Sequence, residues 1–399
     1  YLFVIFNNSL KQKEILFDWR RARVVPILKS GVPQCVFNYR PISLTSVCCK
    51  TLEHIVCRHI TDYLEENNLL TGAQHGFRRG LSTVTQLVTT LHDFALALNK
   101  RKQVDAIFLD FAKAFDKVPH HKLVQKLYAI GIKHDLVQFV QSYFSNRSQF
   151  IEIDKQISSQ LSVSSGVPQG SVLGPILFLI YINDIVDSVD DRVRVRLFAD
   201  DCILYKEVEP RNDQLALENN LQNVFAGCEH WQMPLNLEKC TLLRVTNKKT
   251  VLNFPYTING TQVKEASEVK YLGVTITSSL NWNTHVANVC AAARRALWSL
   301  RRKLPLAPSS VKPCAYKTLV RPVLEYACVV WDPCTQKAID ELEKVQRLAA
   351  RFICNRYRRL DSPSEMLKSL ELESLSSRRK NFRLKFLYLI KNNYFNLDS

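Results

Sequence analysis

The sequence predicts an α+β fold, in which a strand-rich central segment lies between two helical segments. Polar and apolar side chains alternate through residues 192–197, before the run Phe198-Ala199-Asp200-Asp201, and the apolar run Cys202-Ile203-Leu204-Tyr205 follows. This pattern is typical of two strands joined by a tight turn. Residues 45–67 and 82–97 instead repeat apolar side chains at helical spacing, the second with Ser82 or Thr83 as its cap. From residue 284 onward the pattern is helical throughout.

The same periodicities predict the remaining elements. We expect short strands at 24–31, 106–109, 239–245 and 269–277, a hairpin at 148–163, and helices at 121–130, 135–144, 171–182 and 213–232. Together they divide the chain into three segments, residues 1–105, 106–283 and 284–399.

Composition points to a globular protein with a polyanionic partner. The 399 residues are 46% hydrophobic and 23% charged, with a net charge of +17, which favours nucleic acid over an anionic membrane surface. Residues 285–399 hold 22 Lys and Arg against 10 Asp and Glu, so most of the excess lies there. The longest apolar stretch, 172–182, contains Gly174 and Pro175 and is too short for a membrane span, so we expect no membrane partner. The 12 scattered cysteines predict reduced thiols in an intracellular protein.

Two interpretations fit the adjacent carboxylates at the predicted turn. Aspartate is good turn chemistry, because its side chain bonds its own backbone. Alternatively, Asp200 and Asp201 meet Asp110, which follows the buried strand 106–109, if the strands are neighbours in one sheet. Carboxylates brought together in this way could hold a pair of divalent ions and support an in-line phosphoryl displacement.

Several motifs occur in the order that reverse transcriptases have them. These motifs are Asp110-Phe111-Ala112-Lys113-Ala114-Phe115-Asp116, Ser165 through Pro175, Phe198 through Asp201, Trp19 through Gly31, Asn38 through Leu44, Gln74 through Gly80 and Tyr271-Leu272-Gly273-Val274. The chain resembles the reverse transcriptases of non-LTR (long-interspersed-type, jockey-like) retrotransposons over residues 15–280. The last of these motifs resembles the family's strand near the primer grip, and part of the basic C-terminal segment resembles its thumb region.

The resemblance implies a role for individual residues. Asp110, Asp200 and Asp201 would be the catalytic acids and, with the carbonyl of Phe111, would hold two Mg2+ or Mn2+ ions. The implied nucleotide-binding residues are Lys29, Arg40, Phe115, Gln169 and Lys239, and the implied template and primer contacts are Arg78, Arg79, Gly166, Pro168 and Gly170.

Phe115 would exclude a 2′-hydroxyl by steric contact. The plainer alternatives are a core aromatic for Phe115, solvated basic side chains for Lys29, Arg40 and Lys239, and an ordinary Gly/Pro turn at 166–170.

The resemblance also implies a right-hand polymerase. Residues 1–105 would form the fingers, 106–283 a palm with an antiparallel sheet, and 284–399 a helical thumb. We expect an RNA-directed DNA polymerase acting on an RNA template, a DNA primer and deoxynucleoside triphosphates; the alternative is a folded nucleic-acid-binding remnant without catalysis. Because the chain starts at Tyr1, we expect a longer polypeptide with an N-terminal endonuclease. Its expected location is a cytoplasmic ribonucleoprotein that acts in the nucleus.

Overall fold

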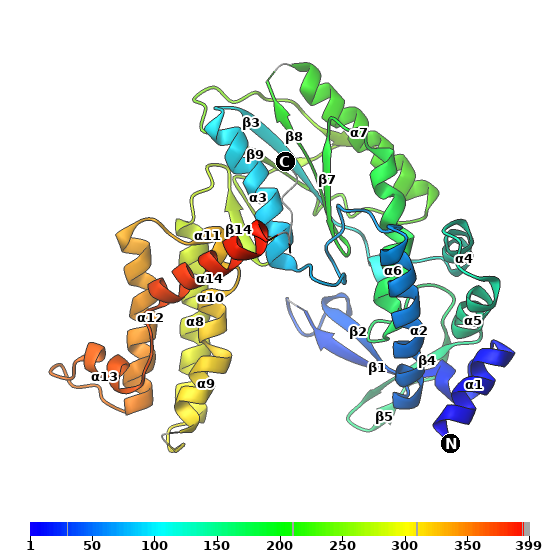
Figure 1. The fold of residues 1–399 in the computed structure, drawn as a ribbon, viewed down its shortest axis with the longest axis horizontal. Helices are drawn as coiled ribbons and strands as arrows, with labels where there is room; N and C mark the ends of the chain where they lie inside the picture. Colours follow the sequence, from blue (N-terminus) through cyan, green and yellow to red (C-terminus); the bar gives the residue numbers. More distant parts are fainter. Residues whose placement is uncertain (30, 210, 309, 393, 395–399) are drawn as a thin grey trace.

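The structure is a computed structural model that describes residues 1–399 except 30, 210, 309, 393 and 395–399. Its ribbon forms an arch (Figure 1). A β-sheet with two long helices lies at the top, N-terminal helices and a second sheet form one limb, and C-terminal helices form the other.

The central sheet has the strand order β12-β9-β3-β8-β7. All neighbouring strands are antiparallel except β12 and β9, which are parallel. The strands are β3 (Gln103–Leu109), β7 (Arg194–Phe198), β8 (Asp201–Val208), β9 (Thr241–Val245) and β12 (Lys264–Glu265). This sheet, flanked by helices, confirms the α+β prediction.

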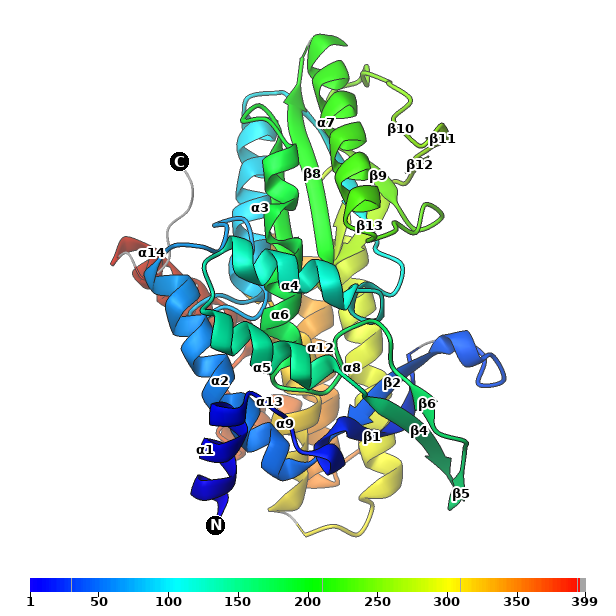
Figure 2. The same cartoon turned by 90° about the vertical axis from the view of Figure 1, so that its right-hand side faces the viewer.

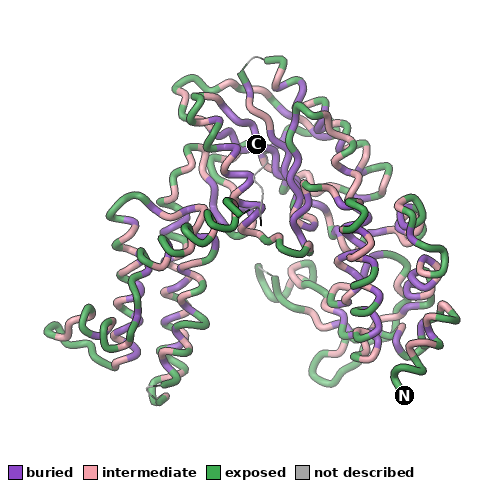
Figure 3. Tube along the Cα trace, in the orientation of Figure 1, coloured by how far each residue is buried: buried purple, intermediate pink, exposed green. Residues whose placement is uncertain are grey.

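Strand β3 lies in the middle of the core and is buried along its whole length. Ile107 and Leu109 belong to one hydrophobic cluster, whereas Ala106 and Phe108 belong to another, because successive side chains of a strand point to opposite faces. Helix α3 (Thr83–Asn99) contributes to the second cluster, and helices α6 (Leu173–Ile182) and α7 (Arg211–His230) contribute to the first. Figure 3 shows this buried trace along the central strands.

The helices of the N-terminal limb confirm the predicted periodicities. Helix α3, which lies against the central sheet rather than in this limb (Figure 1), begins after Ser82, whose hydroxyl accepts a hydrogen bond from the Thr85 amide as a helix cap. In the limb itself, helix α2 spans Val47–Glu66. The other helices here are α1 (Leu2–Gln12), α4 (His120–Ala129) and α5 (His134–Phe144).

The second sheet joins two segments that are distant in sequence. Its order is β2-β1-β4-β5, with β6 also paired to β4, and it projects from the helices of this limb (Figure 2). The strands are β1 (Arg21–Leu28), β2 (Tyr39–Leu44), β4 (Ser148–Ile153), β5 (Gln156–Ile157) and β6 (Leu161–Ser162). The hairpin expected at 148–163 is present, but β4 pairs in parallel with β1, so a cut at residue 105 does not separate the two spatial units. Residue 30, within the predicted strand and turn at 24–31, lies outside the described residues.

The strand expected at 269–277, which includes Tyr271-Leu272-Gly273-Val274, is not continuous but a hairpin of two strands. Leu272 and Gly273 have φ of 44° and 84°, so the chain turns there between β13 (Glu268–Tyr271) and β14 (Val274–Thr277). A left-handed pair of residues is typical of a tight hairpin turn. Strands β10 (Thr257–Ile258) and β11 (Thr261–Gln262) form a further short hairpin.

The second limb is helical in every regular element described, as expected. Its helices are α8 (Asn283–Lys303), α9 (Val311–Leu319), α10 (Arg321–Glu325), α11 (Cys328–Trp331), α12 (Gln336–Cys354), α13 (Pro363–Ser369) and α14 (Leu375–Lys391). Helix α12 buries Leu342, Val345, Ala349 and Phe352 against its neighbours, which is the face of an amphipathic helix.

Within the described ranges, no helix is long and apolar enough to cross a membrane. The 12 cysteines of the chain are free thiols in this structure.

Candidate active site

The adjacent carboxylates lie at the tip of the β7–β8 hairpin. Phe198 pairs with Asp201, so Ala199 and Asp200 form a two-residue turn, and Ala199 has a left-handed φ of 54°. Beside this hairpin, Leu109 pairs with Cys202. The antiparallel register therefore brings Asp110, the next residue, opposite Asp201.

The pKa values of Asp200 and Asp201 are both raised, and the charge of the nearby Asp110 contributes to each rise. Burial raises the pKa of Asp200 above its ordinary 3.8, and the charge of Asp110 adds to this rise. Asp201 reaches solvent, yet the surrounding protein and the charges of Asp200 and Asp110 raise its pKa to about 6. The positive charges of Lys29 and Arg40 act in the opposite direction on both pKa values.

We expect this crowding to affect stability with a defined sign. An acid whose pKa is higher in the folded state binds more protons there, so its contribution to the free energy of unfolding falls as pH rises through about 4 to 6. In metal-free protein, Asp201→Asn is expected to raise the thermal midpoint by about 1 °C at pH 7.5 and to leave it unchanged near pH 4. Calorimetry in EDTA measures both. Asp135→Asn is the control, because Lys13 lowers the pKa of Asp135; a midpoint for Asp201→Asn at or below wild type at pH 7.5 would contradict the expectation.

The strand end at Asp110 is anchored by the segment before β9. The Asp110 carbonyl accepts from the Asn236 amide at 2.7 Å, and the Ala112 amide donates to the Pro234 carbonyl at 2.8 Å. Since carbonyls alternate in direction along an extended chain, the Phe111 carbonyl faces away from this segment. Lys239 Nζ lies 3.7 Å from Asp110 Oδ2, so the structure brings this lysine to the acids.

Lys29 directly follows β1, and Arg40 lies in β2, so both belong to the β1–β2 hairpin. The Lys29 amide donates to the Asn38 carbonyl at 2.8 Å, and Arg40 pairs with Ile27. Both side chains are exposed, and both charges act on Asp200 and Asp201. The hairpin therefore presents two cations toward the acidic turn.

Phe115 combines features of both interpretations. Its ring stacks on Phe178 of α6, with the centroids 4.3 Å apart and the planes at 20°, and packs against the larger core cluster. Phe115 is only partly buried. The ring of the exposed Phe77 packs against it in an edge-to-face arrangement, with the two ring centroids 6.4 Å apart. The ring is thus fixed from below while part of it stays accessible.

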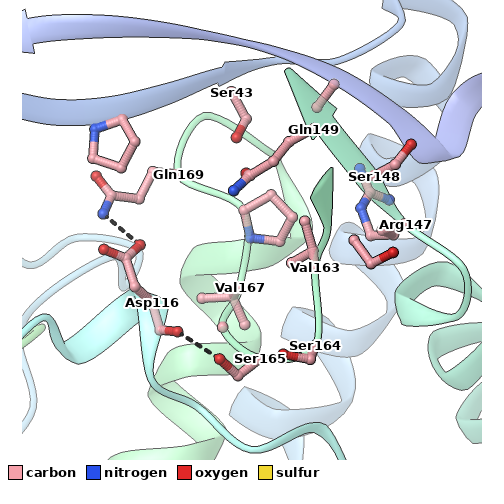
Figure 4. A pocket seen from close by; sticks show the side chains of 15 residues that line it. Ser43, Asp116, Arg147, Ser148, Gln149, Val163, Ser164, Ser165, Val167 and Gln169 are labelled. Carbon is pink, nitrogen blue, oxygen red and sulfur yellow. Dashed lines mark hydrogen bonds between the residues drawn. The ribbon is translucent and has the colours of Figure 1, made fainter. Parts of the chain in front are cut away.

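The loop 166–170 packs against other parts of the chain, and its residues 166–169 line a cavity of about 340 Å3 (Figure 4). Asp110, Asp200 and Asp201 do not line this cavity. A Cβ at Gly166 would lie 2.6 Å from the Asp116 carbonyl oxygen, and one at Gly170 would lie 2.7 Å from that of Ser43. With φ of 85° and 105° these positions favour glycine. The two glycines that the resemblance implied as template and primer contacts therefore lie, in this structure, close against Asp116 and Ser43.

Asp116 is a residue of this region that the sequence argument missed as a site. Its Oδ1 accepts from Gln169 Nε2 at 2.8 Å (Figure 4), which orients the glutamine side chain, and Pro168 lines the same cavity. Its place six residues after Asp110 in one motif was the signal that could have identified it.

The two consecutive arginines are engaged with α2. Arg78 forms a bidentate ion pair with Glu65, in which Nε lies 3.0 Å from Oε1 and Nη2 lies 2.5 Å from Oε2. Its Nη1 donates to the Thr71 carbonyl. Arg79 Nη1 lies 2.7 Å from Asp62 Oδ1, and its side chain is 64% exposed. The structure therefore leaves Arg79 reachable, whereas Arg78 braces the loop after α2.

The donor set at the hairpin tip fits a divalent cation. The charge of Asp110 contributes to the raised pKa values of Asp200 and Asp201, so negative charge gathers at this turn, and hard oxygen ligands suit Mg2+ and Mn2+. Among the described residues no three His, Cys, Asp or Glu side chains already converge as a ligand group. A bound ion would therefore need ligands beyond these side chains, such as the Phe111 carbonyl and the substrate itself.

Comparisons with known proteins agree with the motif order. A family model described as reverse transcriptase (RNA-dependent DNA polymerase) matches residues 27–276. The probable RNA-directed DNA polymerase from transposon BS of Drosophila melanogaster is 28% identical over 372 residues, covering 88% of this chain and 40% of that protein. The RNA-directed DNA polymerase from mobile element jockey of Drosophila funebris is 30% identical over 368 residues, with coverage of 88% and 40%.

The chain thus spans about two fifths of the length of these curated relatives. A solved structure of telomerase from Candida tropicalis, in complex with a fragment of telomeric RNA, matches with a TM-score of 0.46 and 10% identity, over 93% of this chain and 68% of that one.

Proposed function

The chain belongs to the reverse transcriptase family and has its right-hand α+β polymerase fold, and on this premise we propose that it extends a DNA 3′-hydroxyl on an RNA template for a non-LTR retrotransposon. The observation that carries the proposal is the meeting of Asp110 with Asp200 and Asp201 at one sheet edge, facing Lys29 and Arg40. Acids and cations in this arrangement suit a reaction that transfers a nucleotide from a triphosphate.

Asp110, Asp200 and Asp201, with the Phe111 carbonyl, would hold two Mg2+ or Mn2+ ions. Bound there, such ions would lower the pKa of the primer 3′-hydroxyl and neutralise the departing pyrophosphate. The remaining site residues would bind and orient the substrates directly.

Lys29 and Arg40 would bind the triphosphate of the incoming nucleotide, Arg40 through its planar fork of donors. Lys239, beside Asp110, would donate a proton to the leaving pyrophosphate or offset its negative charge. Phe115 would press against the sugar and exclude a 2′-hydroxyl, while Gln169, held by Asp116, would orient the nucleotide or the template base.

For the nucleic acid itself, Arg79 would contact a template phosphate, and Pro168 with its flanking glycines would contact the template or primer. We assign fingers, palm and thumb to residues 1–105, 106–283 and 284–399, with β4 joining the fingers sheet. We also propose an N-terminal endonuclease in the whole polypeptide; the curated relative is longer than this chain, which leaves room for one. We place the protein in a cytoplasmic ribonucleoprotein that acts in the nucleus.

Primer extension tests this function. Purified protein, Mg2+, an RNA template with an annealed DNA primer and the four deoxynucleoside triphosphates are expected to yield full-length DNA. Omission of Mg2+, or its removal by EDTA, is expected to stop synthesis. Binding of the primer–template without any extension would favour the non-catalytic remnant instead.

Arg40→Ala is expected to raise KM for deoxynucleoside triphosphates by about tenfold or more with little change in kcat. A charge-assisted hydrogen bond to phosphate contributes about 1.5–3 kcal/mol to binding, so its loss weakens the binding of the triphosphate. Steady-state single-nucleotide incorporation measures both constants. Arg58→Ala, an exposed arginine of α2 that faces Asp62, is the control. An unchanged KM for Arg40→Ala would remove Arg40 from the nucleotide site.

A further inference from the structure

A short segment before α3 lies against the edge of the catalytic hairpin. Gln74 forms a parallel bridge with Leu197 of β7. The Leu197 amide donates to the Ala73 carbonyl at 2.9 Å, and the His75 amide donates to the Leu197 carbonyl at 2.9 Å. The segment 73–75 is thus joined to the edge strand β7 through an isolated bridge, two residues before Ala199.

The Gln74 side chain binds this turn directly. Its Oε1 accepts from the Ala199 amide at 2.9 Å and from the Gly76 amide at 2.7 Å, while Nε2 donates to the Ala199 carbonyl at 3.3 Å. Only 1% of Gln74 is exposed, so water does not offer these backbone groups an alternative partner. One buried amide therefore satisfies both polar backbone groups of the residue before Asp200.

Ala199 needs such support because of its backbone conformation. Its φ of 54° is left-handed, which is disfavoured for a residue with a Cβ atom. Gly76 packs so closely that a Cβ there would collide with the Ala199 backbone nitrogen. The Gln74–Gly76 segment thus holds the turn in a conformation that its own sequence does not favour.

The same segment also reaches Phe115. Phe77 follows Gly76 with a φ of 56°, and its ring meets that of Phe115 edge-on, with the planes at 85°. Residues 74–77 therefore contact both the acidic turn and the aromatic ring beside it, from one stretch of backbone.

We propose that Gln74 is a positioning residue, which fixes the Asp200–Asp201 turn through Ala199 and so sets the catalytic carboxylates in their place. The effect of Gln74 on catalysis rests on the proposed polymerase function, whereas its hydrogen bonds to Ala199 do not. Without the glutamine amide, the Ala199 backbone groups lose their partners and the turn relaxes toward an ordinary conformation. Asp200, the next residue, then moves relative to Asp110.

Gln74→Met tests the geometry, because methionine has a similar length and no comparable hydrogen-bonding groups. In native-state amide exchange we expect the protection factor of Ala199 to fall by about tenfold or more, since its amide loses a buried acceptor. The amides of β3 are expected to keep theirs. Gln346→Met is the matched control: Gln346 is also fully buried and bonded to Tyr316 and Glu373, but it lies in α12. Gly76→Ala, which presses on Ala199 from the same side, is expected to give the same local loss.

Function and metal binding test the consequence. For Gln74→Met we expect kcat of primer extension to fall by about 10²-fold, as for a small displacement of reacting groups, with KM for deoxynucleotides within about threefold of wild type. The dissociation constant for Mn2+ on the free protein, measured by electron paramagnetic resonance, is expected to rise several-fold, and Gln346→Met is expected to match wild type in each assay.

Wild-type values of Ala199 protection, Mn2+ affinity and kcat in Gln74→Met would overturn the positioning role. If the wild-type protein itself extends no primer, the proposed function fails, and the exchange of Ala199 still decides whether Gln74 holds the turn.

Discussion

Replacing Asp200 by asparagine is expected to lower primer extension on an RNA template by about 10³-fold or more, the effect of losing several kcal/mol of transition-state stabilisation. Asparagine keeps the size of the side chain but removes the negative charge that a divalent cation requires. Because burial and Asp110 already raise the pKa of Asp200, removing this charge relieves repulsion, and the variant is expected to fold at least as well as wild type. Single-turnover extension with Mg2+ measures the rate, and thermal unfolding measures the fold.

Asp135→Asn serves as the control, because Asp135 is an exposed aspartate of α5 that pairs with Lys13. It is expected to extend primers at the wild-type rate. If Asp200→Asn kept a rate within a few-fold of wild type, any synthesis seen would have to come from residues other than this acidic turn, and the assignment of the site would be wrong.

Replacing Phe115 by valine is expected to lower the preference for deoxynucleotides over ribonucleotides by about 10²-fold, the range of a steric discrimination of a few kcal/mol. The Phe115 ring is held by Phe178 beneath it and Phe77 beside it, so it cannot move away from a 2′-hydroxyl without disturbing its neighbours. A smaller side chain leaves room for that hydroxyl. The ratio of kcat/KM for matched deoxy- and ribonucleotides on one RNA template gives the result.

Two variants separate the steric role from ordinary packing. Phe115→Tyr keeps the ring and is expected to keep the preference, whereas Phe139→Leu trims a buried ring of α5 and is expected to affect stability alone. If Phe115→Val kept the wild-type preference for deoxynucleotides, Phe115 would be an ordinary core aromatic and not a steric filter.

Local sequence patterns determined the elements and the order of the motifs. The apolar spacing in residues 45–67 and 82–97, with Ser82 before the second, was enough to predict α2 and α3, because helical periodicity and capping involve residues only a few positions apart. The alternation through 192–197 and the apolar run 202–205 likewise predicted β7, β8 and a turn at Asp200. The family match over residues 27–276 agrees with motifs that could be read in order along the chain.

Other features depended on contacts that no local pattern encodes. The sequence contains Arg78 and Glu65 but not their ion pair, and it contains Lys239 without its proximity to Asp110. The resemblance implied that Gly166 and Gly170 contact the template or primer, whereas their nearest neighbours in the structure belong to the chain. Basic side chains and glycines look the same in sequence whether their partner is a ligand or another part of the fold.

The acidic turn shows most clearly which features depend on local sequence and which depend on tertiary structure. The sequence by itself determined that Asp200 and Asp201 lie at a hairpin tip and that Asp110 ends a buried strand, because each statement rests on neighbouring residues. Only the tertiary structure decided that the register of β3 and β8 brings Asp110 opposite Asp201, and that Gln74 holds Ala199 in its left-handed conformation. Strand register and buried side-chain hydrogen bonds join residues far apart in the chain, so they are fixed by packing of the whole domain rather than by the local sequence.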